Sequence, residues 1–72
     1  MKDKTDAARI GKILRELRGI RIQKGVAREL GISQNSLVNY EKGRRIPPDD
    51  VKKKIASYYG VSIDIFFADH NN

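Results

Sequence analysis

The segment QKGVARELGISQNSLVNY, residues 23–40, decides the fold. Two helices joined by a turn of roughly three or four residues must cross at a steep angle. Gly31 tolerates the positive φ that such a turn needs. A close crossing also needs a small side chain in the first helix, which Ala27 supplies, and a buried residue in the second, which is Leu37. The spacing therefore predicts a pair of helices packed across a tight turn.

Apolar residues recur at helical spacing along the rest of the chain, glycines mark the breaks, and strand signals are missing. We therefore predict an all-α fold, a compact five-helix bundle over residues 6–68 with tails at 1–5 and 69–72. The expected helices begin near Asp6 behind a cap from Thr5 or Asp6, at Gln23, after the N-cap Ser33, at Pro48 or Asp49, and after the N-cap Ser62. Their expected ends lie near Arg18, at Leu30, at Tyr40 or Glu41, before Gly60, and near Phe67.

The inward faces follow from the same spacing. The first helix carries an apolar stripe formed by Ile10, Ile13, Leu14 and Leu17. The fourth carries Val51, Ile55 and Tyr59, and the last carries Ile63, Phe66 and Phe67. We expect the lysines of residues 52–54 to lie on the outer, solvated side of the fourth helix.

Composition excludes several classes of protein. There is no cysteine, and His70 beside two terminal asparagines lacks co-ligands, so we expect no metal site and no cofactor. No nucleophile–base pair or phosphate-binding loop is readable, so no catalytic residue is assigned and an enzyme is not expected. No apolar run approaches the roughly 18 residues of a membrane span, and the polar N-terminus is unlike a secretory signal. A cytoplasmic protein is expected.

Positive charge is concentrated in one part of the chain. Residues 1–47 hold twelve Lys or Arg against five acids, whereas residues 48–72 hold three Lys against four Asp, within a net charge of +6. Such a distribution suits a polyanion, either nucleic acid or an anionic membrane surface, although solvated basic residues also keep small proteins soluble.

A longer pattern surrounds the paired helices. It consists of Ile10-Gly11, Leu14, Leu17-Arg18, Gln23, Ala27, Gly31-Ile32-Ser33, Tyr40-Glu41-Lys42-Gly43-Arg44-Arg45-Ile46-Pro47, Ile55-Ala56 and Gly60-Val61-Ser62-Ile63. With these residues the chain resembles the phage-repressor (Cro-type) helix-turn-helix family, also called the XRE family, over roughly residues 8–68. The run glutamate-x-glycine-basic-basic-x-proline after the third helix is the most diagnostic piece.

The resemblance implies a transcriptional regulator, with repression the expected action, whose third helix lies in the major groove of a near-palindromic operator. The implied base contacts are Gln34, Asn35, Val38 and Asn39. Gln and Asn side chains can bridge adenine, and valine can meet a thymine methyl. The implied phosphate contacts are Gln23, which can also brace Gln34, together with Ser33, Ser36, Lys42, Arg44 and Arg45. Arg18 and Glu41 are expected to form a structural ion pair, so Glu41 is not a catalytic carboxylate.

The chain departs from the family pattern around the start of the second helix. The connection from Arg18 to Gln23 is about two residues shorter than usual. Ile22 stands where a capping Ser or Thr is usual, and Gly25 replaces a good helix former. A helix-interior glycine costs about 1 kcal/mol relative to alanine, so this helix depends on tertiary packing.

Two further expectations concern partners. Because one small unit makes few base contacts, we expect a homodimer on paired half-sites. Its interface would use C-terminal apolar residues, namely Ile65, Phe66 and Phe67, with Tyr58; the alternative is that these residues complete the core of the monomer. The alternative function is a protein-interaction regulator, such as an antitoxin or anti-repressor, that uses the same fold to bind a partner protein.

Overall fold

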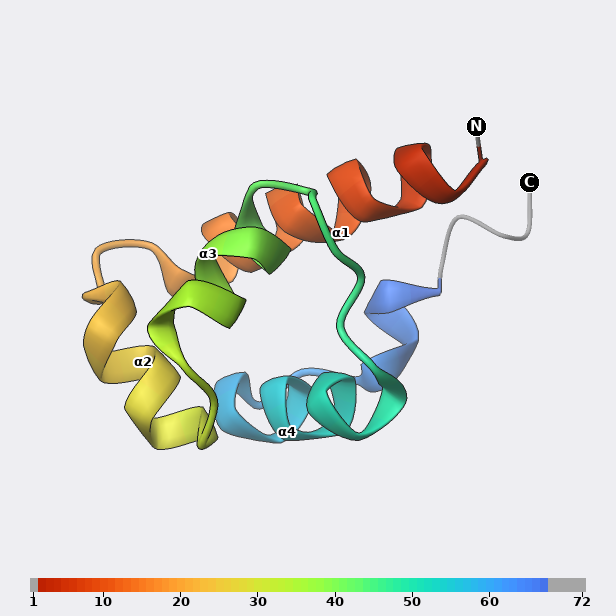
Figure 1. Cartoon of the computed structure of the whole chain (residues 1–72). Helices are drawn as coiled ribbons and strands as arrows, with labels where there is room; N and C mark the ends of the chain where they lie inside the picture. Colours follow the sequence, from red (N-terminus) through yellow and green to blue (C-terminus); the bar gives the residue numbers. More distant parts are fainter. Residues whose placement is uncertain (1, 68–72) are drawn as a thin grey trace.

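The computed structural model describes the backbone of residues 2–67 and the side chains of residues 6–67. The elements in chain order are α1 (Lys2–Arg18), α2 (Gln23–Leu30), α3 (Gln34–Glu41), α4 (Asp49–Tyr59) and the 3₁₀ helix η1 (Ile63–Phe66). Figure 1 shows α1 along the top with α3 beneath it, α2 on the left and α4 along the bottom. The all-α class is therefore confirmed for the part of the chain that the structure describes, and the predicted bounds of α2 hold at both ends.

The first helix begins earlier than predicted. α1 starts at Lys2, within the segment predicted to be a tail, so neither Thr5 nor Asp6 is its N-cap. The prediction relied on apolar periodicity, which charged residues do not display. A stretch without Pro or Gly nevertheless continues a helix at little cost. The predicted C-terminal tail, with His70, lies outside the described residues.

The fifth helix is a single 3₁₀ turn, not an α-helix. Ser62 caps it as predicted, since its Oγ accepts a hydrogen bond from the Asp64 amide at 3.1 Å. The amides of Ile65 and Phe67 donate to carbonyls three residues earlier, at 3.2 and 2.9 Å. A segment this short gains too few i→i−4 bonds to nucleate an α-helix, so the tighter form prevails. Arg9 of α1 completes the turn, with Nη2 donating to the Phe66 carbonyl at 2.7 Å.

Apolar side chains from all five elements meet in one core. Ile55 of α4 and Phe66 of η1 are 0% and 1% exposed, whereas Phe67, which we expected on the inward face, is 38% exposed. The core residues are Ile10, Leu14, Val26, Ala27, Leu30, Leu37, Tyr40, Val51, Ile55, Ala56 and Phe66. Ala27 and Leu37, the two residues predicted to allow the crossing of α2 and α3, both belong to it.

Lys52 corrects the expectation that the three lysines of α4 face solvent. Its neighbours Lys53 and Lys54 are exposed, but Lys52 itself is only 7% exposed. Its Nζ lies 3.8 Å from Asp49 Oδ1 and 4.5 Å from the ring centroid of Phe67. The long aliphatic stem is buried against the core while the ammonium keeps a carboxylate and an aromatic face as partners.

The described residues contain no helix long and apolar enough to cross a membrane. Among the same residues, no group of three or more His, Cys, Asp or Glu could hold a metal ion.

Candidate nucleic-acid interface

α3 presents a polar face at its N-terminal end. Gln34 and Asn35 are exposed, and the next side chains on this face, Val38 and Asn39, are half-buried. Leu37 is buried beneath them and holds the helix against the core. Because amide groups donate and accept at the same time, two of them in the first turn can read the edges of a polar ligand.

The turn that places α3 forms as the sequence predicts. Gly31 has φ 73°, and the amides of Gly31 and Ile32 donate to the Arg28 and Ala27 carbonyls at 3.1 and 3.0 Å. This is the Schellman pattern that ends a helix at a glycine. α3 begins two residues after Ile32, so its direction is set by a short connection that two backbone hydrogen bonds anchor to α2.

Two serines cap the start of α3. Ser33 Oγ accepts a hydrogen bond from the Ser36 amide at 3.0 Å, and the two hydroxyls lie 2.9 Å apart in a second hydrogen bond. An N-cap of this kind satisfies one of the free amides of the first turn. The remaining amides and both hydroxyls lie together at the positive end of the helix, where an anion is favoured.

A second glycine shapes the basic loop after α3. Gly43 has φ 75°, and the amides of Gly43 and Arg44 donate to Tyr40 and Asn39 at 3.2 and 2.9 Å, again in the Schellman pattern. A side chain on Gly43 would lie 3.1 Å from the Ala8 Cα, so the loop sits tightly against α1.

This tight loop carries three exposed cations, which are Lys42, Arg44 and Arg45. The Arg45 guanidinium lies 5.7 Å from the ring centroid of Tyr40, whose side chain is buried in the core. This contact holds Arg45 beside the end of α3, and the loop places Lys42 and Arg44 close to it in the chain.

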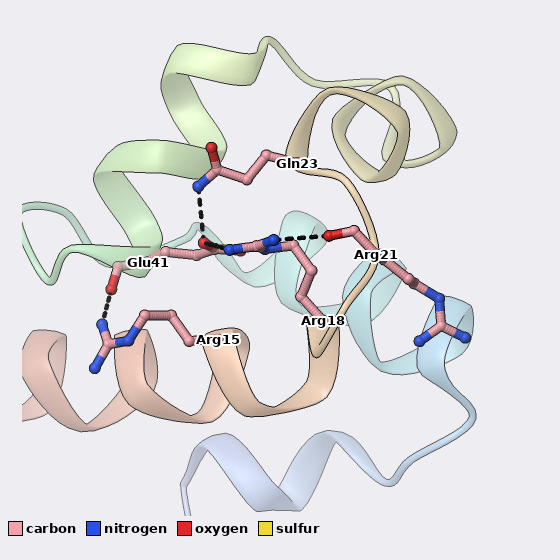
Figure 2. A network of polar contacts seen from close by, with 5 residues as sticks. All are labelled: Arg15, Arg18, Arg21, Gln23 and Glu41. Carbon is pink, nitrogen blue, oxygen red and sulfur yellow. Dashed lines mark hydrogen bonds and ion pairs between the residues drawn. The ribbon is translucent and has the colours of Figure 1, made fainter.

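Glu41, the last residue of α3, joins three helices (Figure 2). Its side chain is nearly buried, and its Oε2 and Oε1 accept from Arg18 Nε and Nη2 at 2.7 and 3.0 Å. Gln23 Nε2 donates to Oε1 at 2.9 Å, and Arg15 donates to the Glu41 backbone carbonyl. These contacts connect the end of α3 to the end of α1 and the start of α2.

The Glu41 carboxylate changes the pKa of its arginine partner. The hydrogen bonds that Arg18 donates to the Glu41 carboxylate raise the pKa of the Arg18 guanidinium, so Arg18 keeps its positive charge at any physiological pH. Arg18 Nη1 also donates to the Arg21 carbonyl at 2.7 Å, which fixes the connection between α1 and α2. Glu41 is therefore a structural carboxylate, and both of its oxygens accept hydrogen bonds.

Gln23, for which the resemblance implied a phosphate contact and a brace for Gln34, contacts the end of α3. Its amide nitrogen is directed to Glu41, as Figure 2 shows. The start of α2 has no side-chain cap, since Ile22 stands at the N-cap position. The departures noted in the sequence thus leave the first-turn amides of α2 without a capping side chain, although Gln23 itself holds the helix to α3.

Two residues of this region were missed in the sequence analysis. Arg15 was not assigned a role, although its spacing of three from Arg18 places both on one side of α1. Gly11 was noted only as part of a family pattern. A Cβ at this position would lie 2.6 Å from the Glu41 carbonyl oxygen and 2.9 Å from that of Tyr40. Glycine is therefore what allows α1 to approach the end of α3.

The residues predicted for a dimer interface do not form one patch. Phe66 is buried in the core and is unavailable to a partner. Phe67 is partly exposed beside Lys52, whereas Tyr58 lies at the far end of α4 and lines grooves next to α2.

Comparison with known proteins identifies one match. A family model described as helix-turn-helix matches residues 12–66, which is most of the chain. Comparisons with curated proteins and with solved structures found no match.

Proposed function

The chain belongs to the helix-turn-helix family, of the XRE type whose domains bind DNA in transcriptional regulators, and we propose that it reads double-stranded DNA through α3. The observation that supports this most directly is the polar N-terminal face of α3. The side-chain amides of Gln34 and Asn35 are exposed there, while Leu37 of the same helix is buried in the core. The loop after α3 adds three exposed cations. A polar reading surface flanked by positive charge suits base edges between two phosphate backbones.

The proposed base contacts are Gln34, Asn35, Val38 and Asn39. Gln34 and Asn35 lie in the first turn of α3, which enters the major groove first in this binding mode. Each bidentate amide–adenine contact contributes roughly 1–3 kcal/mol of discrimination. Val38 offers a methyl surface to thymine, and Asn39 lies one turn further along the helix.

The proposed phosphate contacts flank α3 on both sides. They are Ser33 and Ser36 at its start, Lys42, Arg44 and Arg45 after its end, and Gln23 at the start of α2. For Gln23 the support is the uncapped first turn of α2, whose amides suit a phosphate oxygen. Contacts of this kind set affinity and register, while the bases set specificity.

We further propose that two chains occupy a near-palindromic operator and repress transcription by covering it. One α3 reads only a few base pairs, so two half-sites about one helical turn apart are needed for a specific site. Sedimentation of the chain with its selected duplex should give two chains per duplex. One chain per duplex would contradict the dimer while leaving DNA binding in place. Because the proposed target is DNA, the protein would act in the compartment that holds it, in keeping with the cytoplasmic location expected from the sequence.

The primary test is selection of bound duplexes from a random DNA library at two salt concentrations, with the natural chain and with Gln34→Ala. We expect one two-fold symmetric site to be enriched and Gln34→Ala to relax the preference at a single position in each half-site. If no sequence is enriched at either salt, the DNA function is wrong. The helix-turn-helix would then serve the alternative role, a regulator that binds a partner protein.

Salt dependence tests the phosphate contacts. Arg44→Ala should lower the affinity for all sequences alike and reduce the slope of log K against log salt by about 1. Lys12→Ala, which removes an exposed lysine of α1 outside the proposed contacts, is the matched control and should leave the slope unchanged. If the two variants gave the same slope of log K against log salt, the basic loop would not be part of the DNA interface.

A further inference from the structure

The second surface of interest lies beside the connection between α1 and α2. Ile20 and Ile22 are 101% and 75% exposed, although isoleucine is among the residues most often buried. A single exposed apolar side chain needs no explanation, but a contiguous apolar patch marks an interaction site. Ile22 is not isolated, because it lines a groove together with the exposed Tyr58 at the end of α4.

Two adjoining hollows form this groove, which we call the α2–α4 groove. One has a volume of about 610 Å³ and the other about 340 Å³, and Glu29 and Tyr58 line both. Figure 1 shows the end of α4 beside α2, and residues of both helices line the groove. Gly25 adds to the open space, since a Cβ there would have no atom within 4 Å. Together the hollows have room for several side chains of a partner.

The charge around the groove is strongly positive. Its lining contains one acidic residue, Glu29, against four basic ones, which are Arg21, Arg28, Lys53 and Lys54. A second copy of the chain would place like charges against one another, which is unfavourable. A DNA duplex would match the charge but has no flexible apolar groups to cover Ile22 and Tyr58.

From this combination we propose that the α2–α4 groove binds an amphipathic segment of a partner protein, with acidic side chains beside at least two apolar ones. The apolar residues pack on Ile22 and Tyr58, while the carboxylates face Arg28, Lys53 and Lys54. An amphipathic helix laid in a groove is a common form of such recognition. The proposal goes beyond DNA binding, because none of these residues belongs to the proposed DNA contacts.

Selection from a library of random peptides displayed on phage, with the full chain as bait, tests the proposal without assuming a partner. We expect enrichment of peptides that carry Asp or Glu and apolar residues at helical spacing. Tyr58→Ser should weaken the best peptide at least tenfold. Ile46→Ser is the matched control, since Ile46 is exposed to the same 38% as Tyr58 but does not line the groove, and it should leave binding unchanged.

Charge reversal gives a second, independent readout. In the double variant Lys53→Glu with Lys54→Glu, both sites are exposed, so the fold should persist, and circular dichroism checks this. Repeating the selection with this variant should shift the enriched peptides away from acidic sequences.

Four outcomes would overturn the proposal. The first is an unchanged preference for acidic peptides after charge reversal, and the second is no enrichment, or enrichment of basic peptides, with the natural chain. The third is peptide binding that Tyr58→Ser does not weaken. The fourth comes from NMR spectra of the chain without peptide, recorded at increasing protein concentration: backbone amide signals of the groove residues that shift with concentration alone. The last of these would identify a second copy as the occupant. Because Tyr58→Ser should leave DNA affinity unchanged, failure here is distinguishable from failure of the DNA function.

Discussion

Replacing Gly11 with alanine tests how closely α1 approaches the end of α3. The added methyl group would lie 2.6 Å from the Glu41 carbonyl oxygen and 2.9 Å from that of Tyr40. Carbon and carbonyl oxygen normally meet at about 3.3 Å or more, so the helices must separate by about 0.7 Å. Overpacking of this kind costs about 1–3 kcal/mol, and we expect the upper part of that range because both obstacles are backbone atoms. Because alanine favours a helix by about 1 kcal/mol over glycine, the net loss in the free energy of unfolding should be about 1–2 kcal/mol.

Gly25→Ala is the matched control within the same chain. Gly25 is also helical, but a Cβ there would meet nothing within 4 Å, so only the propensity gain of about 0.5–1 kcal/mol applies. Urea unfolding followed by circular dichroism measures both variants, provided that the urea dependence of the unfolding free energy is unchanged. The two variants should differ by about 1.5–3 kcal/mol in unfolding free energy, or more than about 6 °C in Tm for a domain of this size. If Gly11→Ala proved as stable as Gly25→Ala, the close approach of α1 and α3 would be refuted.

Three further outcomes follow from the polar contacts. Glu41→Gln should cost about 3 kcal/mol in urea unfolding, because it leaves the Arg18 charge without its buried partner. A cost below about 0.5 kcal/mol, as for a surface pair, would contradict this reading. Ser33→Ala should cost about 1 kcal/mol through loss of the N-cap of α3, and an unchanged stability would show that the cap contributes nothing. Burial raises the pKa of Tyr59, so its contribution to stability is complete below about pH 10 and is lost as the pH rises further. Between roughly pH 9 and 11 the free energy of unfolding should therefore fall less steeply with pH in Tyr59→Phe than in the natural chain. Tyr58→Phe should keep the steep fall. Equal slopes in the two variants would exclude Tyr59 as the cause.

Local signals explain which parts of the fold were predictable. The turn between α2 and α3 depends on Gly31 and on the cap Ser33, and each acts on backbone within a few residues of itself. Such features are written into short stretches of sequence, so their positions could be predicted to the residue. The family resemblance added the longer-range pairing of Arg18 with Glu41, which spacing alone does not reveal.

The features that escaped prediction depend on distant partners. Lys52 is buried because Asp49 and Phe67 give its ammonium two partners, and Phe67 reaches it only once η1 has folded back on α4. η1 in turn is completed by Arg9, from the other end of the chain. Gln23 donates to Glu41, a residue 18 positions away at the other end of α3, and no local signal in the sequence indicates this contact. None of these contacts can be predicted from a short stretch of neighbouring residues.

Glu41 shows why a negative charge belongs beside a surface proposed to bind a polyanion. A carboxylate at the end of α3 would by its charge alone repel a phosphate group. It is only 2% exposed, however, and Arg18 and Gln23 occupy its oxygens. Its charge is therefore neutralised before any ligand arrives, while the same contacts hold α3 to the two helices that carry it. With Ser33 fixing one end of α3 and Glu41 the other, the exposed amides between them are held at a set angle. A surface that reads sequence depends on such fixed geometry more than on one further unit of positive charge.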